Sequence, residues 1–244
     1  MNQRPYVYIV GAGPGDKELL TLKAYRLLTE VAEVVVYDRL IPDEIINMIP
    51  EGVERIYAGK SCRKHHMTQD EINACLVEQA NAGKIIVRLK GGDPFIFGRG
   101  GEETETLIKH GINIEVVPGV SAATACSAVL GIPLTHRGLA HSVRYITGHQ
   151  QKGQDVNLDW QGLADPQTTL VIYMGLAHIG TIAENLIKHG LDKHTPSVAI
   201  QDGTSPEQRQ HFTTLDKLAA ELEALAFQPP TLVVIGKVVA LGRG

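Results

Sequence analysis

The stretch YVYIVGAGPGD at residues 6–16 joins a short apolar run to a glycine-rich loop. The run over residues 6–10 predicts a strand, because short apolar runs bounded by turn residues fit strands buried on both faces. The next segment, residues 17–30, has apolar side chains at helical spacing: Leu19, Leu20, Leu22, Leu27 and Leu28. A strand, a tight loop and a helix in this order predict the first unit of an α/β fold.

The same alternation continues along the chain. Apolar runs at residues 33–37, 54–58, 84–89 and 113–117 predict the other strands of the first half. Runs at residues 143–147, 168–173, 197–200 and 231–235 predict those of the second half. Helices are predicted over 68–83, 102–110, 177–189 and 215–227, and Thr68 and Glu71 form a capping box at the first of these. We therefore expect two α/β domains, residues 1–118 and 119–244, with mostly parallel sheets.

Composition excludes several classes of protein. The 244 residues allow one large or two small domains at about 150 residues each. Hydrophobic residues at 43% and charged residues at 20% are typical of a globular protein and exclude global disorder. The net charge of −4 argues against a broad basic surface for nucleic acid. Three cysteines without a CxxC pair favour a reduced cytoplasm, and neither a signal peptide nor a membrane span is expected.

The loop at residues 11–16 has the setting of a dinucleotide-binding fingerprint. Asp38 ends the second predicted strand, where an acid that binds the ribose would lie. However, the third glycine of G-x-G-x-x-G would fall on Asp16, and an acid at a helix start repels a pyrophosphate. Asp16 is better explained as a helix cap. A nicotinamide-dependent oxidoreductase or a nucleotide sensor is therefore the alternative class of function.

The densest motif is KGGDPFIFGRGGEE at residues 90–103, directly after a predicted strand. Five of its fourteen residues are glycine, which lets backbone approach a ligand closely and adopt positive φ. Such a loop costs backbone entropy, so a binding site is favoured over a packed turn. Asp93 has two explanations, a side chain that binds an ammonium or hydroxyl group or a cap of the turn.

Further candidates lie after other predicted strands. Ser121 suits the N-cap of a helix with exposed amides at its start. If Arg99, Arg137 and Arg144 converge in one cleft, their guanidinium groups suit the binding of carboxylates. If they do not, each is explained as a member of a surface ion pair. Met174 either lines a binding pocket or fills the hydrophobic core. The ten histidines form no HExxH motif and no zinc-type spacing with cysteine, so no metal site is expected.

Six motifs in order resemble those of the tetrapyrrole methylase family: GAGPGD, YDRL at 37–40, GGDPFIFGRGGEE at 91–103, Pro118-Gly119, GIPLTHR at 131–137 and YMG at 173–175. The resemblance covers nearly the whole chain. It is strongest to those members of the family that methylate uroporphyrinogen III. It implies two α/β domains with the active site in the inter-domain cleft, a homodimer, and S-adenosylmethionine as cofactor. The implied reaction methylates C2 and C7, giving precorrin-2 through precorrin-1 for sirohaem and cobalamin synthesis. The chain has no room for the N-terminal module of bifunctional relatives, so the stand-alone form is expected.

The resemblance also assigns roles to individual residues. It assigns cofactor binding to Pro14, Gly91, Gly92, Asp93, Ile96, Ser121, Ala122, Met174 and Gly203. It implies that Asp38 is the proton acceptor and Lys60 the proton donor. It assigns substrate binding and catalysis to Arg99, Glu102 and Arg137. Ser121 stands where the family often has threonine, which keeps the hydroxyl group.

The implied chemistry agrees with these residue types. A substrate with eight carboxylates suits arginines in its site. Carbon methylation must be followed by loss of a proton, which Asp38 or Glu102 would accept. Within the family, a later precorrin methyltransferase or a relative that acts on RNA or protein remains the alternative. The negative net charge disfavours RNA.

Overall fold

The computed structural model describes residues 7–59, 67–148 and 158–242. The chain divides into two compact units, Met1–Ala122 and Ala123–Gly244. Within the described residues, no helix has the length and apolar character needed to cross a membrane.

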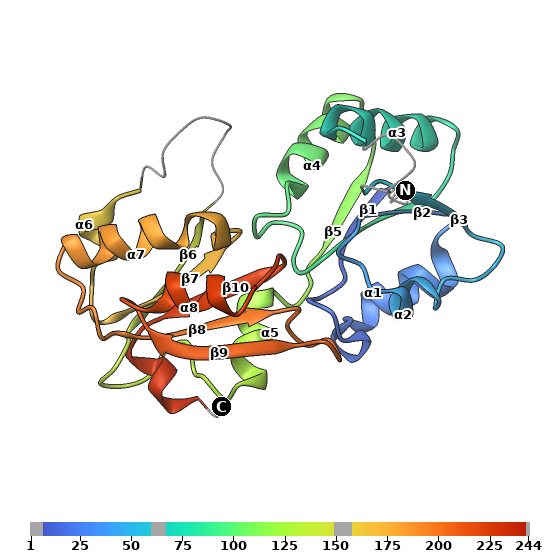
Figure 1. The fold of residues 1–244 in the computed structure, drawn as a ribbon. Coiled ribbons are helices and arrows are strands. Elements are labelled where there is room, and N and C mark those ends of the chain that lie inside the picture. The colour runs from blue at the N-terminus through green and yellow to red at the C-terminus, as the bar shows by residue number, and fades with distance from the viewer. Residues whose placement is uncertain (1–6, 60–66, 149–157, 243–244) are drawn as a thin grey trace. The chain divides into compact units, whose positions relative to one another are not determined.

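The first unit is built on a five-stranded parallel sheet (Figure 1). Its strands are β1 (Val7–Gly11), β2 (Val34–Tyr37), β3 (Glu54–Tyr57), β4 (Ile86–Lys90) and β5 (Ile114–Val117), in the order β3-β2-β4-β1-β5. The central pair places Val7 opposite Ile86 and Gly11 opposite Lys90. Because all five strands run in one direction, the loops that follow them emerge at one edge, where open parallel sheets bind ligands.

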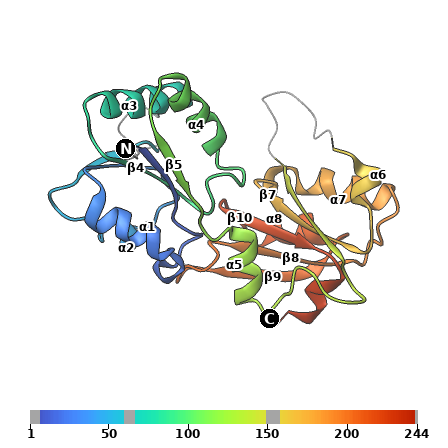
Figure 2. The ribbon, with the colours of Figure 1, turned by 180° about the vertical axis from the view of Figure 1, so that it is seen from behind.

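Helices cover both faces of this sheet (Figures 1 and 2). On one face lie α1 (Leu22–Arg26), the π-helical turn Leu27–Val31 and α2 (Asp43–Ile46), and their core includes Leu28, Ile45 and Leu89. On the other face lie α3 (Gln69–Asn81) and α4 (Gly100–Lys109), whose core includes Leu76, Leu107 and Ile86. Side chains alternate along a strand, so β4 serves both cores.

Two of the predicted caps, Thr68 and Asp16, are confirmed. Thr68 accepts the Glu71 amide at 3.2 Å while the Glu71 carboxylate accepts the Thr68 amide at 2.6 Å, which completes the capping box of α3. Asp16 accepts the Glu18 amide at 2.8 Å and so caps a short 3₁₀ turn, Lys17–Leu19. The helix predicted over residues 17–30 is interrupted after this turn, because Thr21 caps a separate helix by accepting the Ala24 amide.

The second unit holds a five-stranded mixed sheet. Its strands are β6 (Ser142–Thr147), β7 (Thr168–Tyr173), β8 (Pro196–Gln201), β9 (Arg209–Thr214) and β10 (Thr231–Ile235), in the order β6-β7-β10-β8-β9. The helices are α5 (Ala122–Val129), α6 (Trp160–Leu163), α7 (Ile179–Lys188) and α8 (Leu218–Ala224), with 3₁₀ turns at Leu176–His178 and Lys237–Leu241. The helices α6, α7 and α8 share one core with the sheet, and α5 lies on its other face (Figure 2).

The prediction of mostly parallel sheets is wrong for the second unit. Only β6 and β7 pair in parallel, and the pairs β7–β10, β10–β8 and β8–β9 are antiparallel. The cause is β9, which the apolar pattern does not show because its sequence, RQHFTT, is mostly polar. This strand is antiparallel to β8 and forms a hairpin with it. After α8, β10 then runs in the direction of β9, so it is antiparallel to β8 as well.

Candidate functional site

Three glycine-rich loops meet at the carboxyl edge of the first sheet. The loop after β1 is hydrogen-bonded to the loop after β4, since Gly92 N donates to Gly13 O at 2.7 Å and Gly13 N to Gly92 O at 3.2 Å. The loop after β5 joins them because Gly119 N donates to Asp93 Oδ2 at 3.1 Å. The motifs GAGPGD, GGDP and Pro118-Gly119 therefore form one structural unit.

Close packing of backbone explains the glycines at this junction. A Cβ atom at Gly119 would lie 2.2 Å from Gly92 O, and one at Gly11 would lie 2.6 Å from the same oxygen. Gly13 and Gly92 also adopt positive φ, at 75° and 65°. Packing and backbone conformation therefore account for the glycines at 11 and 13 without a bound dinucleotide.

Asp93 acts as the cap of its turn. Oδ1 accepts the Phe95 amide at 2.9 Å and Oδ2 accepts the Gly119 amide. Each oxygen already has a backbone donor, so its direct role is to fix the loops after β4 and β5. The other predicted cofactor residues of this unit, Pro14, Gly91, Gly92, Ile96, Ser121 and Ala122, lie in these loops or at the start of α5.

Backbone strain gathers in the loops that follow strands. Positive φ values occur at Phe97 and Arg99 after β4, at Met174 after β7, and at Asp202 and Thr204 after β8. Such conformations cost about 1–3 kcal/mol each in a residue other than glycine and cluster at functional sites. Phe95 and Met174 are also more than half exposed, at 57% and 51%, which is unusual for large apolar side chains held in ordered loops.

Arg99 and Glu102 pair with each other at the start of α4. The Arg99 Nε and Nη2 atoms donate to the two Glu102 oxygens at 2.8 and 2.6 Å. This hydrogen bonding raises the pKa of Arg99 and lowers the pKa of Glu102. Both side chains are exposed, so the ion pair contributes little to stability, and the guanidinium is held at the same edge of the sheet.

A buried charged cluster lies beneath this edge, and sequence reasoning missed it. Glu103 is fully buried, and its Oε1 atom accepts Arg88 Nε at 3.1 Å, Lys90 Nζ at 3.1 Å and Gln69 Nε2 at 3.2 Å. Burial and the charge of Arg88 lower the pKa of Lys90. The available signal was the pair of cations within β4, because charges in a strand buried on both faces require partners.

Asp38 lies next to this cluster. Its Oδ1 atom accepts the Leu40 amide at 3.0 Å, and its Oδ2 atom lies 3.6 Å from Arg88 Nη2. The carboxylate is 27% exposed, so it is open to a ligand at the carboxyl edge of β2. The structure thus places Asp38, Asp93 and Arg99 on loops, and Glu102 in the first turn of α4, at one edge of the first sheet.

The second unit gathers its own candidates. The strands β6, β7 and β8 end at the same edge because β7 is parallel to β6, and both β7 and β8 are antiparallel to β10. Met174 and Gly203 follow β7 and β8 there. The Tyr173 hydroxyl accepts the Ala123 amide at 3.0 Å, and a Cβ atom at Gly203 would lie 2.3 Å from Cys126 Sγ. The hydrogen bond holds the start of α5 at this edge, and the absence of a side chain at Gly203 leaves room for Cys126 of the same helix.

Other predicted residues are placed differently. Arg137 is exposed and lies in the segment that enters the amino end of β6, whereas Met174 and Gly203 follow carboxyl ends. Arg144 is an exposed side chain of β6 itself, so the structure shows no convergence of these arginines within the second unit. Lys60 lies outside the described residues.

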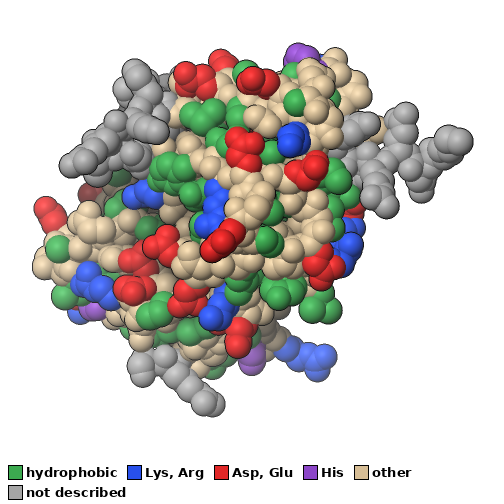
Figure 3. Space-filling model, turned by 90° about the vertical axis from the view of Figure 1, so that its right-hand side faces the viewer, with side chains coloured by type: hydrophobic (Ala, Val, Ile, Leu, Met, Phe, Trp, Pro, Cys, Tyr) green, Lys and Arg blue, Asp and Glu red, His purple; other side chains and the backbone are tan. Residues whose placement is uncertain are grey.

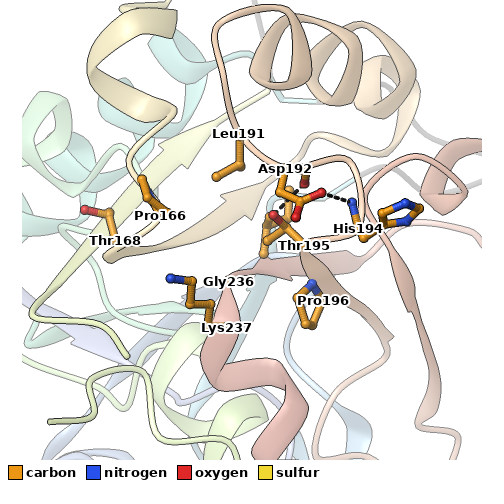
Figure 4. A pocket seen from close by; sticks show the side chains of 10 residues that line it. Pro166, Thr168, Leu191, Asp192, His194, Thr195, Pro196, Gly236 and Lys237 are labelled. Atoms are coloured by element: carbon orange, nitrogen blue, oxygen red, sulfur yellow. Dashed lines mark hydrogen bonds between the residues drawn. The ribbon is translucent and has the colours of Figure 1, made fainter. Parts of the chain in front are cut away.

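A separate cavity of about 110 Å³ opens in the second unit (Figure 4). Thr168 and Pro196 line it from the amino ends of β7 and β8, and Ile235 from the carboxyl end of β10. The turn beside it is internally bonded, since Asp192 Oδ1 accepts the His194 amide at 2.9 Å. This cavity contains none of the predicted site residues, and it lies at the opposite edge of the sheet from Met174 and Gly203.

One face of the molecule mixes charges of both signs. On the face in Figure 3, lysine and arginine side chains alternate with acidic ones and form no continuous basic area. This agrees with the net charge of −4. On this face the pattern is not that of a nucleic-acid-binding surface.

Comparisons with known proteins place these motifs in one family. The family Tetrapyrrole (Corrin/Porphyrin) Methylases matches residues 6–219, which include all the motif loops of the first unit and the segments around Arg137, Met174 and Gly203. The chain belongs to the tetrapyrrole methylase family. The resemblance drawn from the motifs is thereby confirmed, as is a fold of two α/β domains.

Similar members of the tetrapyrrole methylase family differ in length. A siroheme synthase of Saccharophagus degradans is 53% identical over 233 residues, which are 96% of this chain and 50% of that protein. An S-adenosyl-L-methionine-dependent uroporphyrinogen III methyltransferase of Arabidopsis thaliana, described as chloroplastic, is 48% identical over 236 residues, 96% of this chain and 64% of that protein. The chain therefore spans about half the length of the siroheme synthases that it matches.

A solved tetrapyrrole methylase has the same fold over nearly its full length. The uroporphyrin-III C-methyl transferase of Thermus thermophilus, complexed with S-adenyl homocysteine, superposes with a TM-score of 0.81 and 42% identity. The match covers 96% of this chain and 92% of that one.

Proposed function

We propose that the chain is an S-adenosylmethionine-dependent C-methyltransferase that acts on uroporphyrinogen III. The observation that carries this proposal is the junction of three glycine-rich loops at the carboxyl edge of the first sheet, with Asp38 at the same edge. The relatives described as uroporphyrinogen III methyltransferases support it, since their similarity extends over 96% of this chain.

The loop junction suits S-adenosylmethionine. Positive φ at Gly92 and the absence of a side chain there leave space beside the start of α5, where the nearest atom to a Cβ would be Ala122 N at 3.9 Å. Amides at a helix start donate to the carboxylate end of such a ligand. Backbone carbonyl oxygens of glycine-rich loops accept from its ammonium end. We assign cofactor binding to Pro14, Gly91, Gly92, Asp93, Ile96, Ser121, Ala122, Met174 and Gly203. Asp93 acts by fixing the loops.

The cofactor supplies an electrophilic methyl group, and this chain's residues position the acceptor and take its proton. Arg99, at the carboxyl edge of the first sheet, binds a carboxylate of the tetrapyrrole, for which guanidinium is suited. The same role is assigned to Arg137 on the family resemblance alone, because Arg137 precedes the amino end of β6. Alignment of the pyrrole carbon with the methyl group supplies about 7–11 kcal/mol of barrier reduction. As the carbon–carbon bond forms, the sulfur–methyl bond breaks and S-adenosylhomocysteine leaves. The methylated carbon already carries an acid side chain and no hydrogen, so the positive charge left on the tetrapyrrole is removed by loss of a proton from elsewhere on the macrocycle, and Asp38 or Glu102 accepts that proton. Lys60 is the proton donor in this scheme.

The finer assignments belong to the same proposal. Methylation at C2 and C7, through precorrin-1 to precorrin-2, rests on the family resemblance. A homodimer rests on it as well. Light scattering coupled to size-exclusion chromatography measures the mass and gives twice the chain mass if the homodimer forms.

Ligand binding tests the cofactor directly. S-adenosylhomocysteine at 100 times its Kd stabilises a protein by about 2.7 kcal/mol, which thermal unfolding detects. The expected result is such a shift with S-adenosylhomocysteine and none with NAD. A shift with NAD alone would support the oxidoreductase or nucleotide-sensor alternative and reject the methyltransferase.

A further inference from the structure

We propose that Glu103 is a positioning residue for methyl transfer, which holds the Arg88 guanidinium against Asp38. This inference rests on the proposed function, because it gives a role to the proton acceptor of that reaction. Glu103 belongs to α4, Arg88 to β4, and Asp38 to the loop after β2, so three separate elements meet at this point. Glu103 ends the motif at residues 91–103, but the family resemblance gives it no role.

The contacts form a chain from the interior to the edge of the sheet. Glu103 Oε1 accepts Arg88 Nε at 3.1 Å, and Arg88 Nη2 lies 3.6 Å from Asp38 Oδ2. Arg88 Nη1 donates to the carbonyl oxygens of Leu89 at 3.1 Å and Val36 at 3.4 Å. Hydrogen bonds therefore hold the Nε and Nη1 atoms of the guanidinium, and its Nη2 atom faces the Asp38 carboxylate at the carboxyl edge of the sheet.

Glu103 is itself held from α3. Gln69 Nε2 donates to Glu103 Oε1 at 3.2 Å and to Asn73 Oδ1 at 3.1 Å, and Asn73 Nδ2 donates to Thr106 Oγ1 at 3.2 Å. These hydrogen bonds join α3 to α4 beside the cluster. The Glu103 carboxylate thus has a defined place before any ligand binds.

The charges of the cluster balance only when Asp38 is included. Arg88 and Lys90 are buried cations, and Glu103 is the one buried carboxylate among their described partners. Asp38 supplies the second negative charge, at the exposed end. Replacing buried ion pairs by apolar residues is often neutral or stabilising, so stability alone does not explain four charges here. A role in placing Asp38 does explain them.

The test compares Glu103→Gln with wild type in methyl transfer to uroporphyrinogen III at saturating substrate. A misplacement of about 1 Å costs about 100-fold in rate, so kcat should fall about 100-fold while the Kd for S-adenosylhomocysteine stays within about threefold. Glu105→Gln is the matched control, because Glu105 is an exposed side chain of the same helix and should leave both values unchanged. A folded Glu103→Gln enzyme with kcat within threefold of wild type would overturn the inference.

A double-mutant cycle separates positioning from a general structural effect. If Glu103 acts through Asp38, then Glu103→Gln should lower kcat by less than about threefold in an Asp38→Asn background. Losses that multiply in the double variant would show that Glu103 acts independently, and would reject the proposal. Wild-type protein that transfers no methyl group to uroporphyrinogen III would instead remove the proposed function, and this inference with it.

A charge-balanced pair covers the case in which Glu103→Gln does not fold. Lys90→Met with Glu103→Leu removes one cation and one anion together, so the cluster keeps its net charge. Compared with Lys90→Met alone, the pair should lose about 100-fold in kcat because Arg88 lacks its anchor. Equal kcat in these two variants would refute the positioning role.

Discussion

The Asp93 carboxylate accepts the Gly119 amide at 3.1 Å, and so joins the loop after β4 to the loop after β5. The other oxygen of Asp93 accepts the Phe95 amide within its own loop. One side chain therefore fixes two of the three loops that carry the family motifs. A site ordered in this way before binding avoids the loop-ordering cost of association.

Replacement of Asp93 tests this loop connection. Asp93→Ala leaves two amides without their acceptor, which should lower the free energy of unfolding by about 1–3 kcal/mol. The Kd for S-adenosylhomocysteine should rise by about tenfold, measured by calorimetry. Asp93→Asn keeps one acceptor oxygen, so its stability and its affinity for S-adenosylhomocysteine should lie between those of Asp93→Ala and of the wild type. Unchanged stability and affinity in Asp93→Ala would contradict the role given to this residue.

Glycine substitutions test the packing of the loops. In Gly119→Ala the new Cβ would lie 2.2 Å from Gly92 O, so the protein should lose about 1–3 kcal/mol of stability. Gly101→Ala is the matched control, since nothing lies within 4 Å of its Cβ and α4 should gain up to about 1 kcal/mol. Urea unfolding midpoints should therefore move in opposite directions. A stable Gly119→Ala protein would mean that the loops are not packed as described.

Arg99→Ala tests substrate binding apart from cofactor binding. The Arg99–Glu102 pair is exposed, so its loss should change stability by only about 0–1 kcal/mol. Turnover should be abolished, while S-adenosylhomocysteine still binds with a Kd within about threefold of wild type. Equal loss of turnover and of binding would point to a role in folding or in the cofactor site instead.

The choice between the two candidate proton acceptors has its own experiment. Asp38→Asn and Glu102→Gln are compared in single-turnover methylation. Asp38 should be the residue whose change lowers the rate by about 10²–10⁴-fold, because its carboxylate is held beside Arg88 while Glu102 is engaged by Arg99. A larger loss in Glu102→Gln would transfer the role to Glu102.

The buried thiol of Cys126 makes stability depend on alkaline pH. Burial raises the pKa of Cys126 from 9.0 to about 11 in the folded protein. Between these values the unfolded chain has lost a proton that the folded chain keeps, so stability falls as pH rises. The loss from this group is about 2–3 kcal/mol between pH 9 and 11. Cys126→Ala should lack this part of the decline in chemical unfolding, and an identical decline in both proteins would contradict it.

Much of the fold was predictable from local patterns. Apolar runs located the strands of the first sheet, and Thr68 with Glu71 located the start of α3. β9 was not predictable in this way, because it is an edge strand with a largely polar sequence. The direction of β10 depends on that strand, so it could not be inferred from alternating strands and helices either.

The candidate site was predictable in its loops and not in its interior. The glycine-rich segments marked the edge of the sheet, but the reason for their glycines, contact between backbones of distant loops, exists only in three dimensions. The cluster of Arg88, Lys90 and Glu103 was missed although Lys90 and Glu103 begin and end the motif at residues 90–103, because the contact of Glu103 in α4 with Arg88 in β4 exists only in the folded protein. A charge within a predicted buried strand was the signal that pointed to it.

The most direct measurement is methyl transfer by the purified protein, with S-adenosylmethionine and uroporphyrinogen III prepared without oxygen. Mass analysis of the product counts the methyl groups added. The proposed function predicts two added methyl groups per tetrapyrrole, with S-adenosylhomocysteine formed in equal number. No methylation of uroporphyrinogen III, in a protein that binds S-adenosylhomocysteine tightly, would contradict the proposed substrate and assign the chain to a different reaction of the tetrapyrrole methylase family.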